Sequence, residues 1–433
     1  DYKFTDLDDE VLDYSGQVMW PMTTDRSRIS ITAGGSYSRK VRTYRETTLE
    51  LVPNAVGNVG LLSRPFGEIF SDENIMGAAN DYQLNLNLDT ARSYIAATIT
   101  DGAFGQIDWI WNETWRFAAG ARWESYRQVS LPWNLYAFDL VNPAVTTDPA
   151  ALEQAVFSDD SYYPSVSLTY MTSWWADVFQ LRFGWSETVV RPDLREITET
   201  SYLDARTDYV TEGCPECVPS DVTNLDLRAE WFFSSGDNLT VTLFHKDLDN
   251  PIEFFEFPAS DTNRGRLIDN AESGSVSGIE VEALKQLGFL GEFWDAFFLQ
   301  GNLTLQDSEL VVGTLRSNVT PTNSTRKLAG ASDYVVNVLL GYDSLDGRHA
   351  STLTYNVFGE RLFAAGRNPT PDIFEQPFDS LDLTYQWYPT DTITVKAKLQ
   401  NILDEETVFE QSGIETFVEK PGRSWSVSAN WSF

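Results

Sequence analysis

The sequence contains no long apolar run, few positive charges, and very few cysteines and histidines. No stretch of about 18 apolar residues occurs, which excludes a transmembrane helix. Lys and Arg total 31 against 64 Asp and Glu, a net charge of −33, and such acidity argues against a nucleic acid as partner. The opening DYKFTDLDDE is acidic and lacks the apolar segment of a signal peptide. We therefore expect either that a leader has been removed or that the chain begins within a longer protein.

Both cysteines lie in the stretch EGCPECVPS. Cys214 and Cys217 have neither a second CxxC pair nor a nearby histidine, which argues against a zinc site. A thioredoxin-like motif needs a strand before it and a helix after it, whereas the Gly, Pro and acidic residues around this one indicate a loop. We predict a small structural disulfide in an extracytoplasmic loop, with a pair of free thiols as the alternative.

No set of residues typical of an enzyme is present. The histidines, His245 and His349, lie near short turns, and no glycine pattern of a nucleophile elbow accompanies them. Carboxylates are abundant, but nothing pairs two of them with the spacing that glycoside hydrolysis needs. The stretch DSLDG at 343–347 is too short for a calcium loop and is a turn signal between two strands. We predict no catalytic residues, no metal site and no cofactor.

Apolar and polar residues instead alternate with a period of two along most of the chain. The last twelve residues, GRSWSVSANWSF, have an apolar face of Trp425, Val427, Ala429, Trp431 and Phe433 opposite a face of small polar residues. The same pattern occurs in VFQLRFGWS, NLDLRAEWFF, SLDLTYQWY and TITVKAKLQ. Such alternation is typical of half-buried β-strands, so the sequence predicts an all-β protein.

Fifteen strands are expected from this pattern. They lie near residues 12–20, 29–51, 92–111, 115–130, 162–173, 177–190, 223–234, 238–257, 264–286, 296–308, 332–342, 348–358, 379–388, 392–403 and 422–433. Because single-chain bacterial barrels have even strand numbers, an odd count suggests part of a larger barrel.

Short turns and long loops alternate strictly between these strands. The short turns lie at 23–28, 111–114, 173–177, 234–238, 343–349 and 388–392, with a slightly longer one after Leu287. The long connections cover about 52–90, 131–160, 191–222, 309–330, 359–376 and 404–421. Short periplasmic turns on one rim and long extracellular loops on the other are typical of outer-membrane proteins, so we predict a transmembrane antiparallel β-barrel.

Aromatic residues make up 13% of the chain, and many of them lie near strand ends and short turns. This is where an aromatic girdle at the membrane interface is expected. The residues are Trp20, Trp111, Trp115, Trp174, Trp175, Trp294, Trp387 and Tyr388. The alternative is that they close the end of a soluble core.

Five charged residues fall on the polar faces of expected strands. They are Arg182, Arg228, Glu230, Lys396 and Lys398. A lipid-facing Arg or Lys would cost about 2–4 kcal/mol near the membrane midplane. We therefore predict that these side chains face the lumen, where water or opposite charges surround them.

The long loops contain aromatic residues that are candidates for ligand contact. Trp133 and Tyr136 lie in LPWNLYAFDL, and Tyr202 and Tyr209 lie in ETSYLDARTDYV. Such side chains stack on sugars or aromatic chelators, and their polar edges form hydrogen bonds. The alternative is that they pack against other loops.

Several stretches resemble the C-terminal barrel portion of TonB-dependent outer-membrane receptors. WRFAAGARWE contains a G-x-R-x-E pattern at Gly120, Arg122 and Glu124, and SETVVRPDLREI contains Arg191-Pro192 and Arg195-Glu196. Further similar stretches follow in the family's order: DLRAEWFFSSGDNLTVTLFHKDLDNPIE at 226–253, NAESGSVSGIEVE at 270–282, YNVFGER at 355–361 and LQNILDEE at 399–406.

This resemblance implies that residues 1–433 form a single partial barrel domain, strands 8 to 22 of a barrel of about 22 strands. The globular plug, the energy-coupling segment and the first barrel strands have no counterpart in the chain. In the family, inward charges such as Arg228 contact the plug. The final strand, with Trp425, Val427, Trp431 and Phe433, is similar to the C-terminal signal that the barrel-assembly machinery reads.

The function that the resemblance implies is active import across the bacterial outer membrane. The cargo would be a bulky, scarce nutrient, namely an iron chelate, cobalamin or an oligosaccharide. Partners would be lipid and lipopolysaccharide, the barrel-assembly machinery, the nutrient, and the TonB complex through the missing N-terminal part. The alternatives are a passive porin-like or structural barrel within a larger surface complex, and a soluble all-β binding protein.

Overall fold

The computed structural model describes residues 2–53, 64–69, 71–75, 82–87, 93–134, 145–203, 209–258, 264–315 and 320–433. Its main feature is one large antiparallel sheet of seventeen strands, two of which, β3 (Tyr82–Asn87) and β16 (Thr325–Arg326), are short side partners. None of the helices in the described ranges is long and apolar enough to cross a lipid bilayer. The predicted all-β class and the fifteen long strands are confirmed.

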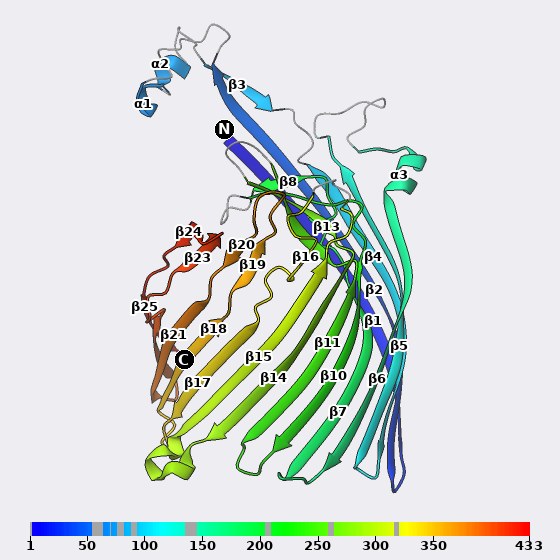
Figure 1. The fold of residues 1–433 in the computed structure, drawn as a ribbon, viewed down its shortest axis with the longest axis vertical. Coiled ribbons are helices and arrows are strands. Elements are labelled where there is room, and N and C mark those ends of the chain that lie inside the picture. Colours follow the sequence, from blue (N-terminus) through cyan, green and yellow to red (C-terminus); the bar gives the residue numbers. More distant parts are fainter. Residues whose placement is uncertain are drawn as a thin grey trace.

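Each long strand pairs antiparallel with the next one along the chain (Figure 1). The strands are β1 (Tyr2–Thr23), β2 (Ser27–Pro53), β4 (Tyr94–Trp111), β5 (Trp115–Pro132), β6 (Val156–Thr172), β7 (Val178–Val190), β10 (Ser220–Phe232), β11 (Asn238–Asp249), β14 (Ser273–Gln286), β15 (Phe297–Val311), β17 (Tyr334–Asp343), β18 (His349–Phe358), β21 (Phe378–Thr390), β22 (Ile393–Gln400) and β25 (Ser424–Trp431). The described part of the chain contains no ladder between β1 and β25. This large sheet, called the wall below, is curved and has two separate edges, β1 and β25.

The first strand is much longer than the predicted 12–20. Acidic residues interrupt the apolar alternation in its N-terminal half, and ion pairs to β2 join this half to the sheet. Asp9 lies opposite Arg42 and accepts two hydrogen bonds of 2.7 Å from its guanidinium. Asp6 pairs in the same way with Arg45. The apolar pattern could not indicate this segment because the stabilising contacts are cross-strand charge pairs.

The predicted end of the strand 238–257 and the predicted start of the strand 264–286 are wrong. β11 ends at Asp249 and β14 begins at Ser273, and between them lies a separate hairpin of β12 (Ile252–Pro258) and β13 (Arg264–Asn270). Asn250 has a positive φ of 52°, and Pro251 has no N–H to donate to a ladder. These two residues turn the chain out of the wall, although the alternation continues through them.

Short turns and long connections lie on opposite rims of the wall (Figure 1). The long connections contain the helices α1 (Phe66–Ile69), α2 (Asp72–Ile75) and α3 (Pro149–Ala155). They also contain two small four-stranded sheets. The first sheet consists of β8 (Ser201–Leu203), β9 (Val210–Glu212), β13 and β12; the second consists of β19 (Arg361–Ala364), β20 (Ile373–Glu375), β23 (Thr407–Gln411) and β24 (Ile414–Glu419).

The most deeply buried apolar side chains of the described residues lie in these connections and at the strand ends beside them. Phe255 of β12 and Leu310 at the end of β15 belong to one cluster, and Ile373 of β20 belongs to another. Each is at most 1% exposed. The loop side therefore has a core like that of a soluble domain, and the wall does not.

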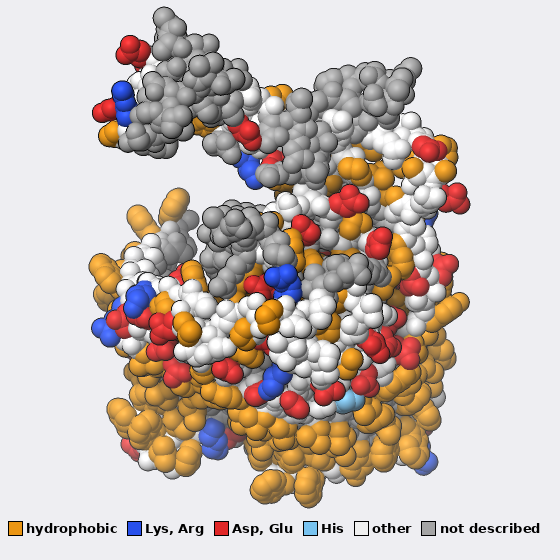
Figure 2. Space-filling view, turned by 45° about the horizontal axis from the view of Figure 1, so that its top comes forward, with side chains coloured by type: hydrophobic (Ala, Val, Ile, Leu, Met, Phe, Trp, Pro, Cys, Tyr) orange, Lys and Arg blue, Asp and Glu red, His pale blue; other side chains and the backbone are white. Residues whose placement is uncertain are grey.

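The wall has an apolar outer face and a polar inner face. Register places Leu227 of β10 beside Phe183 of β7 and Leu243 of β11, and all three are exposed on the outside. Figure 2 shows the outer apolar band below a rim of charged and polar side chains. On the inner face, Asn302 lies opposite Asn337, whose Nδ2 donates to Asn302 Oδ1 at 2.7 Å. Each strand of the wall therefore has apolar side chains on the outer face and polar side chains on the inner face.

Because the two faces differ, the same substitution at two adjacent positions should have different effects on stability. Leu303 pairs with Val281 and Val336 on the outer face. Leu303→Arg should lower the free energy of unfolding in lipid vesicles by about 2–4 kcal/mol, because the charge enters hydrocarbon. Urea titration of the full-length protein would measure this difference.

Asn302→Arg is the matched control, because Glu282 lies opposite it on the inner face. The control should unfold at nearly the urea concentration of the unsubstituted protein. Equal losses for the two variants would show that the assignment of the faces is wrong.

Candidate functional site

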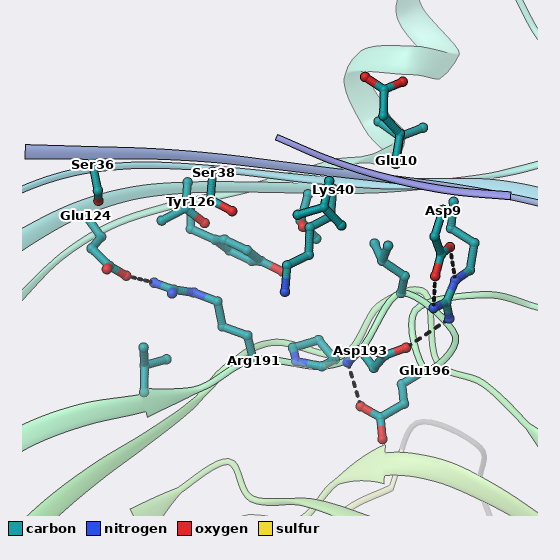
Figure 3. Close-up of a pocket in the computed structure, with 18 of the residues that line it drawn as sticks. Asp9, Glu10, Ser36, Ser38, Lys40, Glu124, Tyr126, Arg191, Asp193 and Glu196 are labelled. Carbon is teal, nitrogen blue, oxygen red and sulfur yellow. Dashed lines mark hydrogen bonds and ion pairs between the residues drawn. The ribbon is translucent and has the colours of Figure 1, made fainter. Parts of the chain in front are cut away.

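A cavity of about 680 Å³ lies against the inner face of β1, β2, β4 and β5, closed by the segment that follows β7 (Figure 3). Charged and hydroxyl side chains form most of its lining, which includes Asp9, Ser36, Ser38, Lys40, Arg42, Thr98, Thr100, Arg122, Glu124, Arg191, Asp193 and Glu196. Residues two apart on a strand share a face, so each strand contributes alternate polar residues to the cavity.

Glu124 on β5 accepts hydrogen bonds from two guanidinium groups. It is 8% exposed and is bonded by Arg122 Nε and by Arg191 Nη2. Arg122 also donates from Nη2 to Ser36 Oγ at 2.8 Å. A Cβ at Gly102, opposite Glu124 on β4, would lie 2.5 Å from Arg122 Nη2. The absence of a side chain at Gly102 therefore leaves room for this guanidinium.

Arg191 connects the segment after β7 to the wall and to the disulfide loop. Its guanidinium carbon lies 4.5 Å from the centroid of the Tyr126 ring. The Tyr126 hydroxyl donates to Gln128 Oε1 at 2.9 Å, and Gln128 Nε2 donates to the carbonyl of Cys217 at 3.0 Å. Cys214 and Cys217 are joined by a disulfide. A continuous polar chain thus runs along β5 into the loop.

A second arginine holds the other end of this segment. Arg42 of β2 binds Asp9 and also donates from Nη1 to Asp193 Oδ1 at 3.2 Å. Asp193 Oδ1 accepts from the backbone N–H of Arg195 at 3.0 Å, and the Asp193 N–H donates to Glu196 Oε2 at 2.7 Å. The turn is therefore fixed both internally and to the wall.

Apolar packing completes the attachment of this segment. Leu194 and Ile197 are buried with Tyr94 and Ala96 of β4, and Tyr44 of β2 packs against the same cluster. These contacts hold residues 191–197 against the wall, and this segment is called the Arg191 shelf below. Lys40 extends from β2 into the cavity beside it (Figure 3).

The cavity presents charged and polar groups to a ligand. Three of its carboxylates form ion pairs with arginines that also line it: Asp9 and Asp193 with Arg42, and Glu124 with Arg122 and Arg191. Within the described ranges, one set of metal-ligand side chains lies close together, Cys214, Cys217 and Asp269. The disulfide leaves no thiolate there to ligate a metal.

Three of the predicted inward charges lie together on the inner face. Arg228 Nε donates to Glu230 Oε1 at 3.0 Å, and Arg182 on the neighbouring strand lies 3.4 Å from Glu230 Oε2. Lys396 and Lys398 lie on the polar face of β22, opposite Ser428 and Ser426 of β25. None of the five lines the cavity.

The three predicted ligand-contacting aromatics that the structure describes, Trp133, Tyr202 and Tyr209, lie in different surroundings. The Trp133 ring lies 5.5 Å from the Arg45 guanidinium, and the Tyr202 ring lies 3.2 Å from that of Arg195. Tyr209 is 4% exposed and packs in the loop core with Phe409 and neighbouring apolar residues. Tyr136 lies outside the described residues.

The C-terminal residues singled out in the sequence lie on the outer face. Trp425 and Val427 are opposite Leu399 and Ala397 of β22, and Trp431 is opposite Ile393. The Trp431 and Phe433 rings are 6.0 Å apart. All four side chains are exposed, as expected of an apolar surface that meets lipid.

A buried ion pair joins two of the long connections, the one between β11 and β14 and the one between β15 and β17. Arg326 Nη2 lies 3.3 Å from Glu253 Oε2, and both side chains are almost wholly buried. Ala329 N–H donates to Glu253 Oε1 at 3.3 Å, and the Arg326 guanidinium carbon lies 5.3 Å from the Phe255 ring centroid. Burial raises the pKa of the Glu253 carboxyl, and the positive charge of Arg326 opposes this rise.

Comparison with known families gives a match across most of the chain. The family described as TonB dependent receptor-like, beta-barrel, matches residues 1–402. Among characterised proteins, the iron-regulated outer membrane virulence protein of Vibrio cholerae is 23% identical over 242 residues. That alignment covers 54% of this chain and 34% of the Vibrio protein.

Solved structures with similar folds include three receptors or transporters. The siderophore receptor PiuA from Acinetobacter baumannii has a TM-score of 0.64 at 14% identity, covering 99% of this chain and 56% of that one. The ferric-catecholate import receptor Fiu from E. coli K12 gives 0.63 at 13%, with 99% and 55% covered. The copper transporter OprC gives 0.64 at 14%, with 99% and 57% covered. The chain spans about half the length of these structures.

The Arg191 shelf generates a first prediction for the site. Glu124→Gln keeps the shape of the side chain but removes the charge that both guanidinium groups bind. A hydrogen bond to a charged group contributes about 1.5–3 kcal/mol, so amides of residues 193–197 should exchange with solvent roughly tenfold faster. Hydrogen–deuterium exchange with mass spectrometry would measure this change.

Glu187→Gln is the control, because Glu187 lies on the outer face of the strand that leads into the shelf. It should leave the exchange of the shelf unchanged. A shelf in Glu124→Gln that exchanges like the unsubstituted protein would contradict the proposed role of this carboxylate.

The buried pair generates a second prediction. Arg326→Met leaves the Glu253 charge buried without its partner, which typically costs about 3–5 kcal/mol. Amides of β12 should then lose protection from hydrogen exchange. The double variant Glu253→Leu/Arg326→Met should recover most of it, because it removes both charges.

Lys327→Met serves as the control for this pair. Lys327 pairs with Asp333 at the surface, and such pairs contribute about 0–1 kcal/mol. If Lys327→Met and Arg326→Met lost similar protection from hydrogen exchange, the protection of β12 would not depend on burial of the Glu253–Arg326 pair.

Proposed function

Since the chain belongs to the TonB-dependent receptor family, we propose that it is part of the barrel of an importer that captures a bulky, scarce nutrient. The barrel lies in the bacterial outer membrane, as in other members of this family. The observation that carries the proposal is the family match over residues 1–402. The polar inner wall supports it, because such a wall can line a path for a hydrophilic cargo.

We propose further that residues 1–433 are one partial barrel domain of a longer protein. The chain covers 56% of the first structural neighbour. The outer edges of β1 and β25 have no partner strand in the part of the chain that the structure describes, and exposed edges in lipid would leave backbone groups unbonded. Further strands, giving about 22 in all, would close the wall.

In the proposed mechanism the wall remains rigid while other parts move. The long connections capture the nutrient, a plug inside the barrel blocks the path, and energy delivered through the TonB complex displaces it. Glu230 with its two arginines, and Lys396 and Lys398, would contact the plug or its hydration layer. The shelf at Arg191 would hold the loops at a fixed height above that surface.

For the cargo we propose an iron chelate first. The names of the neighbours, a siderophore receptor and a ferric-catecholate import receptor, support this class. The cavity places five carboxylates beside Lys40 and three arginines, so its lining offers polar contacts of both charges and does not select among the cargo classes. Cobalamin and an oligosaccharide remain the other cargo classes to test.

A passive porin-like or structural barrel is the second candidate. The observation that favours it is the polar inner face, which would also suit diffusion of small hydrophilic solutes. The two functions differ in their energy source. Import by the receptor stops without TonB, whereas diffusion through a porin continues.

Uptake measurements separate these functions. Iron-starved cells that express the full-length protein should accumulate radiolabelled iron from a ferric catecholate or a ferric hydroxamate complex. The uptake should fall to background when TonB is deleted, because the energy source is then lost. Cells with the empty vector provide the baseline.

Uptake that persists without TonB would contradict active transport and favour the porin. Absence of iron uptake, combined with TonB-dependent uptake of cobalamin or a labelled oligosaccharide, would keep the importer and change the cargo. Absence of uptake for all three classes would contradict the import proposal.

A further inference from the structure

The small sheet of β19, β20, β23 and β24 continues one sector of the wall beyond its rim. The strand order of that sector is β18, β21, β22 and β25. The order of the small sheet is β19, β20, β23 and β24, and each of these strands is joined by a short connector to the wall strand in the same position. Because the two orders agree, β24 lies above β25 at the edge of the wall (Figure 1).

Asn401 holds the β23–β24 hairpin in this position. Its side chain is 9% exposed, and its Nδ2 donates to the carbonyls of Glu405 at 3.0 Å and of Gly422 at 3.2 Å. One side chain thus joins the connector before β23 to the connector after β24. The Asn401 N–H donates to Asp382 Oδ1 of β21 at 2.8 Å. The free edge of β24 is therefore kept in line with the free edge of β25.

The backbone hydrogen bonds show which amide of β24 faces this free edge. Backbone groups of successive strand residues point alternately to the two sides of the strand. The Val408 carbonyl accepts from the Gln376 N–H at 2.9 Å, so the groups of Val408 point towards β20 and those of Phe409 towards β24. Phe417 lies opposite Phe409, and Val418 lies opposite Val408. The Val418 N–H therefore points away from β23, to a side where no strand of the described ranges pairs with β24.

An apolar side chain of β24 is also incompletely covered. Phe409 of β23 is 4% exposed within the loop core. The Phe417 ring lies 5.6 Å from the Phe409 ring but is 41% exposed. A strand with free backbone groups and exposed apolar side chains pairs readily with any other strand that reaches it. Both features are explained if a further strand lies beside β24 and covers Phe417.

We propose that β24 is the docking edge for the extracellular end of the strand that closes the wall against β25. This inference rests on the partial barrel domain proposed above, because the closing strand belongs to the full-length protein outside residues 1–433. Continuity of the two edges supports this occupant, since a strand that pairs antiparallel with β25 and continues past the rim runs directly beside β24. The six residues of β24 extend the seam of the barrel by about 20 Å outside the membrane.

Hydrogen exchange of single amides in the full-length receptor tests the docking edge. Mass spectrometry with electron-transfer fragmentation resolves the two neighbouring amides. The Val418 amide should exchange at least about a hundredfold more slowly than an unpaired amide. The Phe417 amide is the internal control, because its N–H points to β23 whether or not a further strand docks.

Mobility on an SDS gel separates failure of the docking from failure of the partial barrel. A closed barrel resists SDS, so an unheated sample should migrate faster than a boiled one. A mobility shift combined with an unprotected Val418 amide would overturn the docking and leave the barrel proposal intact. Absence of the shift would contradict the closed barrel and the docking together. Protection of Val418 that disappears on dilution of the receptor would also overturn the proposal, because the occupant would be a second copy.

Two substitutions at the same position give an independent test. Val418→Pro and Val418→Ala both shorten the side chain, but only the proline removes the N–H. With a docked strand, the amides of residues 414–417 should exchange roughly tenfold faster in Val418→Pro than in Val418→Ala. Equal exchange in the two variants would overturn the proposal, because a free edge tolerates proline. The amides of β20 should be the same in both.

Discussion

Backbone hydrogen bonding in lipid is the constraint on which this structure depends. No water is available inside a bilayer to bond free N–H and C=O groups, so each long strand of the wall pairs with the next one along the chain. Strand pairing in turn imposes the period of two, because successive side chains point to opposite faces. Leu303 and Asn302 are adjacent in the chain but belong to an apolar exterior and a polar interior. The composition, with its modest apolar content and no long apolar run, is a consequence of this division.

The same constraint explains why the hydrophobic core lies in the long connections and not in the wall. An apolar outer face that meets lipid gains nothing from packing inward, so burial between protein segments occurs among the long connections. There Phe255 and Ile373 are as buried as residues in a soluble domain, and the Glu253–Arg326 pair lies between connections that are far apart in sequence. These connections can therefore have a fixed shape of their own while the wall is held by its ladders.

The sequence predicts the wall well because two-faced strands leave a local signal. Strand positions, the alternation of short and long connections, and the inner placement of Arg228 and Glu230 follow from residues two apart. The missed parts depend on contacts between distant segments. The N-terminal half of β1 is held by Arg42 and Arg45 of the next strand, and the β12–β13 hairpin continues the same alternation outside the wall. Burial of Tyr209 depends on Phe409, two hundred residues away along the chain, so its local pattern could not distinguish a ligand contact from a core residue.

The candidate site shows how local and distant contacts combine. Arg122 and Glu124 are two residues apart on β5, so the sequence predicts that they share a face. Arg191 joins them only because the strand order brings the segment after β7 close to β5, and the sequence does not show this contact. The result is an inner wall whose charges already have partners: Glu124 with two arginines, and Glu230 with two more. A plug or a cargo that meets such a wall must exchange existing hydrogen bonds rather than neutralise bare charges, so the net gain from each contact is small. In the proposed importer, small gains per contact are what allow a tightly fitting partner to be displaced by a modest pull, while the wall itself keeps its shape.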